Sequence, residues 1–243
     1  MPPNNPYIEK VKADPDILVN TDEIYTHKWK WAEYFWNDNS LVLEIGTGMG
    51  NYFGKIVWEN PEKNFLGMEI RYKRLFSSAE KARANSPSCF AGIPLDEGEQ
   101  KSLLRRGRCP KDGGSYNFVI LKDFWEHIDS IFTAEEISET YIFFPDPWAN
   151  KDRQRKHRLM QAPFLEKLYQ ITKTWGTIIF KSDHREYFDS TVEIIKEQWL
   201  WEIQTHIHHY EKSELFDIKN ITSFEAMYRW EQKEINYLKL VKS

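Results

Sequence analysis

The chain has 243 residues, and its 33 Lys and Arg against 37 Asp and Glu give a formal net charge of -4. This length allows a sizeable core in one domain, and 15 Phe, 12 Tyr and 10 Trp exclude disorder of the whole chain. With no long apolar run, no basic-then-apolar signal region and only two cysteines, we expect no membrane span, no secretion and no disulfide framework, and a cytoplasmic location.

The alternation of apolar runs and helical spacing predicts an α/β fold. Residues 1–20, with four prolines, are expected to be a poorly ordered lead-in, and 22–37 a helix. Strands are predicted at 41–45, 64–70, 117–121, 140–144, 176–180, 201–210 and 235–242, and helices at 51–60, 71–85, 124–138, 159–172 and 184–199. We therefore expect a mostly parallel, doubly wound sheet with an antiparallel strand near the C-terminus.

A glycine-rich turn closes the first predicted strand of this series. Gly46, Gly48 and Gly50 alternate there, and Glu44 lies two positions before them. Glycines permit a tight turn and a close approach of a ligand, and Glu69, after the second strand, suits the two hydroxyls of a ribose. The E-x-G-x-G-x-G spacing differs from the dinucleotide form GxGxxG and resembles the S-adenosyl-L-methionine (AdoMet) pocket of Rossmann-like methyltransferases. The strand–turn–helix context disfavours the alternative, a glycine turn without a ligand.

Asp123 follows the predicted strand 117–121 and has two interpretations. Its carboxylate could accept a hydrogen bond from the exocyclic amine of adenine. It could equally cap the helix that follows. The sequence leaves both roles open.

A second constellation follows the strand 140–144, which ends at Pro145-Asp146-Pro147-Trp148. Ligands of open α/β sheets bind beyond the carboxyl ends of strands, where two prolines hold Asp146 and Trp148 offers a flat surface for a base. Five Lys and Arg then occur within 151–158. A charged run is usually a solvated face, but its position beside this turn favours contact with phosphates.

The string FFPDPWANKDRQRKHRLMQAPFLEKL resembles the signature of the bacterial-type tRNA (guanine-N7-)-methyltransferases, the TrmB family. LEIGTGMG and GMEIRYKR resemble the cofactor segments of that family, KSDHREYFD a later strand end, and TSFE its C-terminal T-x-F-E. The resemblance covers about residues 40–232. It implies a class I AdoMet-dependent methyltransferase that methylates N7 of guanine at position 46, in the variable loop of tRNA.

The resemblance and the two constellations together give a predicted set of site residues. Asp146 is the predicted catalytic residue. The predicted cofactor residues are Glu44, Gly46, Gly48, Gly50, Glu69, Ile70, Arg71, Asp123, Phe124 and Asp146. The predicted substrate residues are Trp148, Lys151, Arg153, Arg155, Lys156, Arg158, Asp183, Thr222, Ser223, Phe224 and Glu225.

The chain departs from the family pattern in three places. Two residues separate Trp148 from Lys151 where the family usually has one, so Asn150 is the ungapped alternative for the substrate lysine. Phe124 replaces a small residue, and 86–115 is an apparent insertion into a single domain, 38–243, that follows an N-terminal extension, 1–37. Thr222 also begins a T-x-x-E capping box, so it is a ligand, a helix cap or both.

Guanine N7 is a lone-pair acceptor without a proton, so this chemistry needs placement and a carboxylate rather than a strong base. An AdoMet-dependent methyltransferase acting on another RNA or a small molecule is the alternative, but it would not need the basic run. His206, His208 and His209 are expected at the surface, and no metal is predicted. The expected partner is tRNA, with a monomer or homodimer, no membrane and no obligatory protein partner.

The mild acidity of the chain seems to argue against a nucleic-acid partner. However, 15 of the 33 Lys and Arg lie in segments 71–83, 101–111 and 151–158, which contain only two acidic residues. The net charge thus averages an acidic body and concentrated basic segments, which can bind phosphates locally.

Overall fold

The computed structural model describes residues 5–85, 117–149 and 152–243. The predicted insertion at 86–115 and the two candidate substrate residues Asn150 and Lys151 lie outside the described residues. The chain divides into two compact units, 1–131 and 132–243, and each is described by itself.

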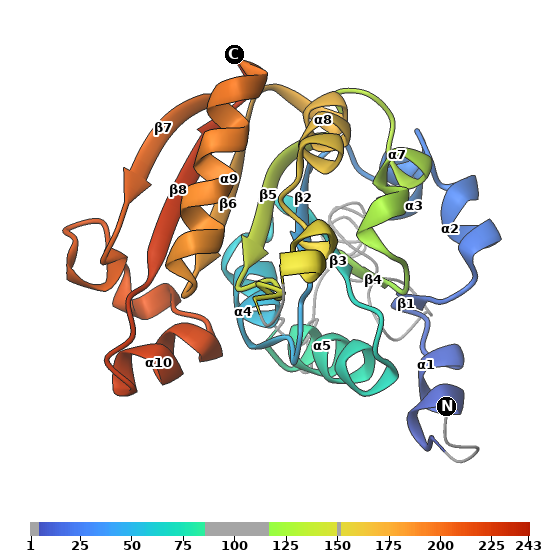
Figure 1. The fold of residues 1–243 in the computed structure, drawn as a ribbon. Helices are drawn as coiled ribbons and strands as arrows, with labels where there is room; N and C mark the ends of the chain where they lie inside the picture. Colours follow the sequence, from blue (N-terminus) through green and yellow to red (C-terminus); the bar gives the residue numbers. More distant parts are fainter. Residues whose placement is uncertain (1–4, 86–116, 150–151) are drawn as a thin grey trace. The chain divides into compact units, whose positions relative to one another are not determined.

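Parallel strands form the centre of the first unit (Figure 1). Their order is β1 (Ile17–Leu18), β4 (Phe118–Leu121), β3 (Lys63–Met68) and β2 (Ser40–Ile45). All neighbouring pairs are parallel, and the register aligns Ile45 with Met68 and Met68 with Leu121. The strands are almost wholly buried, as expected of a parallel sheet covered by helices. Their carboxyl ends therefore lie at one level, and the residues that follow them share one edge.

The helices of the first unit follow the strands closely. They are α1 (Tyr7–Lys12), α2 (Thr21–Thr26), α3 (Trp31–Phe35), α4 (Asn51–Glu59), α5 (Tyr72–Asn85), η2 (Trp125–His127) and α7 (Ile128–Ile131). The helices α4 and α5 pack tightly at Gly54, where an added Cβ would lie 2.8 Å from backbone atoms of Lys81. This close contact brings the middle of α5 beside the turn that follows β2.

The expectation of a poorly ordered lead-in is wrong for residues 7–18. Val11, Ile17 and Leu18 are buried, and β1 adds a strand to the edge of the sheet. Arg83 on α5 forms ion pairs with the nearly buried carboxylates of Asp14 and Asp16. The three apolar side chains, dispersed among prolines and charges, carry too little periodicity to predict these contacts.

Two predicted helices are also shorter than expected. The helix predicted at 22–37 is two helices, α2 and α3, separated by Trp29 with a left-handed φ of 66°. The helix predicted at 124–138 ends at Ile131, because Ile137 already begins β5. The other predicted elements of the described residues form with small shifts of their bounds.

The second unit contains a mixed sheet with the order β5 (Ile137–Phe143), β6 (Thr172–Ser182), β8 (Asn236–Val241) and β7 (Glu202–Ile207). The pair β5–β6 is parallel, and β8 is antiparallel to both of its neighbours, which confirms the predicted antiparallel strand near the C-terminus. Its helices are α8 (Ala162–Ile171), α9 (Arg185–Gln198) and α10 (Ser223–Trp230), with 3-10 turns η3 (Asp152–His157), η4 (Tyr210–Lys212) and η5 (Ile218–Asn220). Among the described residues, no helix is both long enough and apolar enough to cross a bilayer.

Candidate active site

The glycine turn after β2 has the left-handed backbone that its glycines predict. Gly46, Gly48 and Gly50 have φ values of 82°, 57° and 75°. The amides of Gly46 and Thr47 both donate to the carbonyl of Met68, at 2.8 and 3.1 Å, which ties the turn to the end of β3. Side chains other than glycine rarely adopt this conformation, so the alternating glycines are required by the backbone path itself.

Serines of α5 hold the turn from the other side. The Ser77 hydroxyl donates to the carbonyl of Met49 at 3.0 Å, and the Ser78 hydroxyl donates to the carbonyl of Gly48 at 3.2 Å. A Cβ on Gly50 would lie only 2.3 Å from the Cα of Ser78. Any side chain at position 50 would therefore displace α5, and the turn would lose its shape.

Two acidic side chains follow β3 and β4 at the same sheet edge. Glu69 Oε1 accepts from the amides of Ile70 and Arg71, at 2.8 and 3.0 Å, and its Oε2 lies 3.7 Å from Arg74. Asp123 Oδ1 lies 2.7 Å from His127 Nδ1 and accepts from the next amide at the same distance. Both carboxylates are only 6% exposed. Local amides thus fix Oε1 of Glu69 and Oδ1 of Asp123, while the second oxygen of Glu69 lies beside Arg74.

The second oxygen of Asp123 answers part of the question that the sequence left open. Asp123 Oδ2 is buried and has no hydrogen-bond partner among the described residues. The first oxygen accepts a local amide, yet the helix that follows has no side-chain cap. A buried acceptor without a donor is costly. The Tyr25 phenol interacts with this carboxylate, since burial and then Asp123 raise the pKa of that phenol, so this hydroxyl and a ligand N–H are both candidate donors.

Glu44 is the most unusual carboxyl group of the first unit. It lies within β2, is 4% exposed, and its Oε2 has no hydrogen-bond partner in the described part of the chain. Burial raises the pKa of Glu44 to about 8. An isolated buried carboxylate is unfavourable unless a positive group neutralises it. Glu44 therefore suits a cationic ligand group near the glycine turn.

The remaining predicted cofactor residues of the first unit are exposed. Ile70 and Phe124 are 43% and 52% exposed, which is unusual for large apolar side chains at strand ends. Arg71 is exposed at the start of α5. The structure thus brings the strand-end residues of the first unit to one edge, with the acidic groups buried and the apolar groups open to solvent.

In the second unit, the turn that carries Asp146 begins and ends in strained backbone. Phe144 and Trp148 have left-handed φ values of 52° and 45°. Phe144 still donates its amide to the carbonyl of Lys181 at 2.9 Å, and its ring contacts Tyr228 at a centroid distance of 5.2 Å. These contacts stabilise a conformation that costs free energy, and they leave Asp146 exposed at the strand end.

Arg158 differs from the prediction that it contacts substrate. Its guanidinium is buried, donates to the carbonyl of Pro147 at 2.8 Å, and pairs with Glu186 on α9. It also lies 4.8 Å from the ring centre of Tyr187, and its hydrogen bond lowers the pKa of Glu186. Arg158 holds the turn of Asp146 against α9 and has no exposed face for a phosphate.

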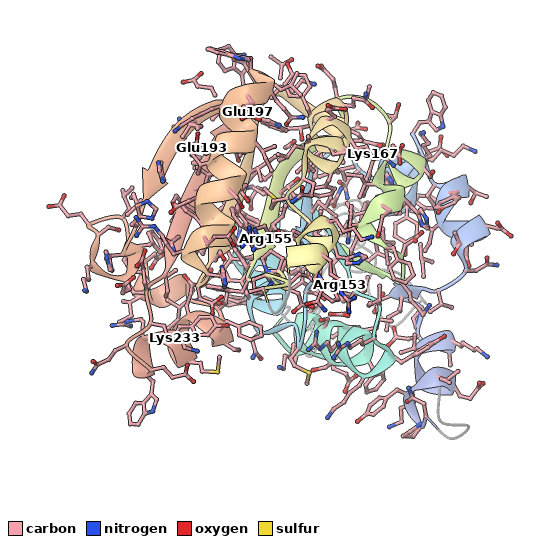
Figure 2. All side chains as sticks on the ribbon, in the orientation of Figure 1. Arg153, Arg155, Lys167, Glu193, Glu197 and Lys233 are labelled. Carbon is pink, nitrogen blue, oxygen red and sulfur yellow. The ribbon has the colours of Figure 1, made fainter. Side chains whose placement is uncertain are left out.

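The other described cations of the basic run point outward. Arg153, Arg155 and Lys156 are exposed on η3, and Figure 2 labels the first two of them. Arg155 also lies 3.5 Å from Glu186. A hollow of about 380 Å³ lies beside them, lined by Trp148, Arg153, Gln154, Lys156 and His157. The indole of Trp148, 41% exposed, packs at 5.5 Å from the His157 ring. This hollow combines a flat aromatic surface with positive charge.

Sequence reasoning missed Gln154 and His157, which line the same hollow. Gln154 Oε1 is buried and has no hydrogen-bond partner among the described residues. Both residues lie within the basic run 151–158, which is predicted to bind phosphate through its Lys and Arg side chains. A Gln or a His between Lys and Arg residues carries no sequence signal that would single it out.

Thr222 and Glu225 form the capping box at the start of α10. Thr222 Oγ1 accepts from the Glu225 amide at 3.0 Å, and the Thr222 amide donates to Glu225 Oε2 at 2.7 Å. Glu225 Oε1 accepts from Lys181 Nζ at 2.7 Å. Glu225 is fully buried, so the prediction that it contacts substrate gives way to a structural role. Of the two roles left open for Thr222, the cap is present.

Lys181 connects this capping box to the end of β6. Burial lowers its pKa, and the neighbouring carboxylate of Glu225 opposes that effect. Its ammonium lies 4.8 Å from the ring centre of Phe143 and 5.0 Å from that of Tyr210. The ion pair thus joins the strand ends to α10 through one aromatic-lined contact.

The other predicted substrate residues near α10 remain accessible. Ser223 and Phe224 are exposed, and the Phe224 ring lies 5.9 Å from that of Phe144. Asp183 is half-buried and close enough to Tyr228 to raise the pKa of that phenol, which burial and Asp183 together bring to about 12. These contacts bring Asp183, Phe224 and the Asp146 turn around one aromatic cluster of the second unit.

The burial of Glu44 predicts a dependence of stability on pH. Between about pH 4.5 and pH 8 the unfolded chain loses a proton that folded Glu44 keeps, so stability falls as pH rises. Glu44→Gln has no such titration. Its free energy of unfolding relative to wild type, from urea titrations of ligand-free protein, should grow by about 3 kcal/mol between pH 5 and pH 8. Glu62→Gln, at an exposed position, is the matched control. A difference for Glu44→Gln that stays constant over this range contradicts the assignment.

Comparison with known proteins identifies the relatives of this chain. Residues 38–238 match the family model whose description is "Putative methyltransferase". A tRNA (guanine-N(7)-)-methyltransferase of Clostridioides difficile is 31% identical over 79% of this chain and 78% of its own length. The protein of the same name from Lachnoclostridium phytofermentans is 30% identical, over 93% and 90%. A bifunctional glycosyltransferase/methyltransferase of Fusobacterium nucleatum is 32% identical over 98% of this chain, which spans 33% of that relative.

Solved structures share the fold at low sequence identity. The 16S rRNA methyltransferase KamB has a TM-score of 0.55 at 13% identity, over 91% of this chain and 92% of that protein. The 16S rRNA (adenine(1408)-N(1))-methyltransferase of Catenulisporales acidiphilia has a TM-score of 0.52 at 15% identity, over 94% and 93%. These similarities confirm the predicted Rossmann-like methyltransferase fold. From the family match and the relatives at 30% and 31% identity, the chain belongs to the tRNA (guanine-N7-)-methyltransferase (TrmB) family of class I AdoMet-dependent enzymes.

Proposed function

We propose that this chain transfers a methyl group from AdoMet to N7 of guanine at position 46 in the variable loop of tRNA. The observation that carries the proposal is the hollow beside the Asp146 turn, where Trp148 meets exposed cations on η3. An aromatic face suits a base, and the cations suit the phosphates next to it. The names of the relatives supply the nucleic acid and the atom that is methylated.

The buried acceptors of the first unit fit AdoMet. Its positively charged amino group is the kind of partner that the buried Glu44 carboxyl lacks, and the adenine amine is a donor of the kind that Asp123 Oδ2 lacks. Glu69 remains the candidate for the ribose hydroxyls. The left-handed turn at Gly46, Gly48 and Gly50 leaves the backbone bare for close approach. When bound, AdoMet supplies an electrophilic methyl group.

The catalytic role that we propose for Asp146 is electrostatic. Guanine N7 attacks with a lone pair and loses no proton, so the chain needs no general base. Positive charge accumulates on the purine ring as the methyl group arrives. A carboxylate held on a strained, proline-flanked turn can stabilise that charge without reorganising. Asp146 can also accept hydrogen bonds from the N1–H and amino edge of guanine, which would orient the base.

The buried contacts of the second unit give the turn its rigidity. Arg158 holds the carbonyl of Pro147 against Glu186 on α9, and the Phe144 ring packs on Tyr228. Placement of a reacting atom to within a fraction of an ångström is a large part of catalysis by orientation. We assign Trp148, Arg153, Arg155 and Lys156 to the tRNA, with Lys151 retained from the family pattern. Asp183, Ser223 and Phe224 are retained for the guanine pocket.

The proposed substrate indicates where the enzyme acts in the cell and which partners it needs. We infer a cytoplasmic location, where tRNA is modified. We also infer a monomer or homodimer that acts without a different protein. A purified chain should therefore methylate tRNA without any added protein.

A methylation assay tests the proposed function directly. The full chain is incubated with methyl-labelled AdoMet and a tRNA transcript with guanine at position 46, and the product is mapped by strand cleavage specific for N7-methylguanine. We expect one labelled site, in the variable loop. The matched control is the same transcript with adenine at position 46, which should take up no label. Label at another position, or label only in a small molecule added to the assay, contradicts the proposal.

Two cations of the same run should respond oppositely to substitution. Lys156→Ala removes an exposed charge, so it should weaken tRNA binding, reduce the slope of log K against log salt by about 1, and leave stability unchanged. Arg158→Met removes the buried anchor, so it should lower the free energy of unfolding by about 2–3 kcal/mol and leave the salt slope unchanged.

Filter binding over a salt series and urea unfolding provide the two readouts for this pair. If Arg158→Met reduces the salt slope while stability stays at the wild-type level, the structural assignment of Arg158 is wrong. If Lys156→Ala leaves both the affinity and the slope unchanged, η3 is not the tRNA face.

A further inference from the structure

A cluster of metal-ligating side chains lies in the second unit outside the proposed active-site residues. Asp189 on α9, His206 on β7 and His208, which directly follows β7, each offer one ligand atom, and these atoms lie within 4.8 Å of one another. The two histidines are two positions apart in the chain, and their ring centres lie 4.8 Å from each other, so the imidazoles are neighbours. The ring of Phe188 on α9 packs against both imidazoles, at centroid distances of 5.4 and 5.3 Å. The cluster therefore joins the edge strand to the helix that covers it.

Asn236 determines which nitrogen of His208 carries a proton. The Asn236 amide nitrogen donates to the carbonyl of Ser182 at 3.2 Å, so its oxygen faces His208. His208 Nδ1 lies 2.6 Å from that oxygen and must donate to it. In the neutral ring, Nε2 then presents a lone pair to Asp189 Oδ1, 3.6 Å away. Two lone-pair acceptors, His208 Nε2 and Asp189 Oδ1, then face each other, and a proton or a metal ion between them would remove their repulsion.

The carboxylate of Asp189 is also oriented by a neighbour. Arg185 Nε donates to Asp189 Oδ2 at 3.0 Å, which leaves Oδ1 directed at His208. Metal-binding histidines usually donate their second N–H to an oxygen, and metal-binding carboxylates usually accept a further hydrogen bond. His208 and Asp189 each have such a partner. His206 is exposed, so its ring is accessible to an ion from solvent.

We propose that Asp189, His206 and His208 bind a divalent transition-metal ion of the zinc type. Two imidazole nitrogens and one carboxylate oxygen are a ligand set that Zn²⁺ accepts, with water as the fourth ligand. The ion would provide the positive centre between His208 and Asp189 and would fasten β7 to α9. This role is structural, so it adds a site to the proposed methyl transfer without changing that chemistry. The competing occupant is a proton on His208 Nε2, which would form a simple ion pair with Asp189.

Calorimetric titration of the metal-stripped full chain with Zn²⁺ tests this site. Wild type should bind one equivalent, and His206→Ala and Asp189→Asn should each reduce the affinity at least about tenfold. His209→Ala removes a neighbouring exposed imidazole outside the cluster and should keep the wild-type affinity. Mg²⁺, which prefers oxygen ligands, should not compete.

Thermal unfolding gives an independent readout that does not depend on activity. Excess Zn²⁺ should raise the Tm of wild type and of His209→Ala, because a ligand of the folded state stabilises it. The Tm of His206→Ala and of Asp189→Asn should stay unchanged. Absence of Zn²⁺ binding by wild type, or binding that survives both substitutions, overturns the proposal and leaves the protonated ion pair as the occupant.

Discussion

Buried carboxyl groups at the ends of parallel strands are the constraint on which the first unit depends. The register of β2, β3 and β4 places Glu69 and Asp123 at one edge, with Glu44 inside β2. One carboxylate oxygen of Glu44 and one of Asp123 lack a hydrogen-bond partner among the described residues, and burial of such atoms destabilises the ligand-free fold. A ligand with N–H donors and a positive charge would offset this destabilisation. The glycine turn, held open by Ser78, provides the approach for such a ligand.

The second unit solves a different problem, which is to hold an exposed carboxylate rigid. Asp146 lies on a turn between two strained residues, and the surrounding cations have different roles. Arg158 is buried and anchors the turn, whereas Arg153 and Lys156 remain at the surface. The fully buried Glu225 similarly joins Lys181 to the start of α10. Charges that look alike in the sequence thus divide into those that build the site and those that face solvent.

The sequence predicted the chemistry-bearing positions better than their roles. The glycine turn, the strand-end acids and the antiparallel strand follow from periodicity and residue type, which are local properties. The family pattern assigns Arg158 and Glu225 to the substrate because it records residue identity and order. Their burial depends instead on contacts with α9 and with Lys181, which are distant in the chain. The sequence does not predict β1, because its two residues form a strand only by pairing with β4. Gln154 was missed because an uncharged residue among cations carries no signal until the hollow is seen.

Single-turnover kinetics of Asp146→Asn test the proposed electrostatic role of Asp146. Asparagine keeps the size and the hydrogen-bonding reach of the side chain but removes the charge. At saturating AdoMet and tRNA, we predict that the rate constant for methyl transfer falls about 10²–10³-fold, while the Kd for AdoMet changes far less. An unchanged rate constant, or equal losses in rate and AdoMet affinity, would exclude an electrostatic role of Asp146 in methyl transfer.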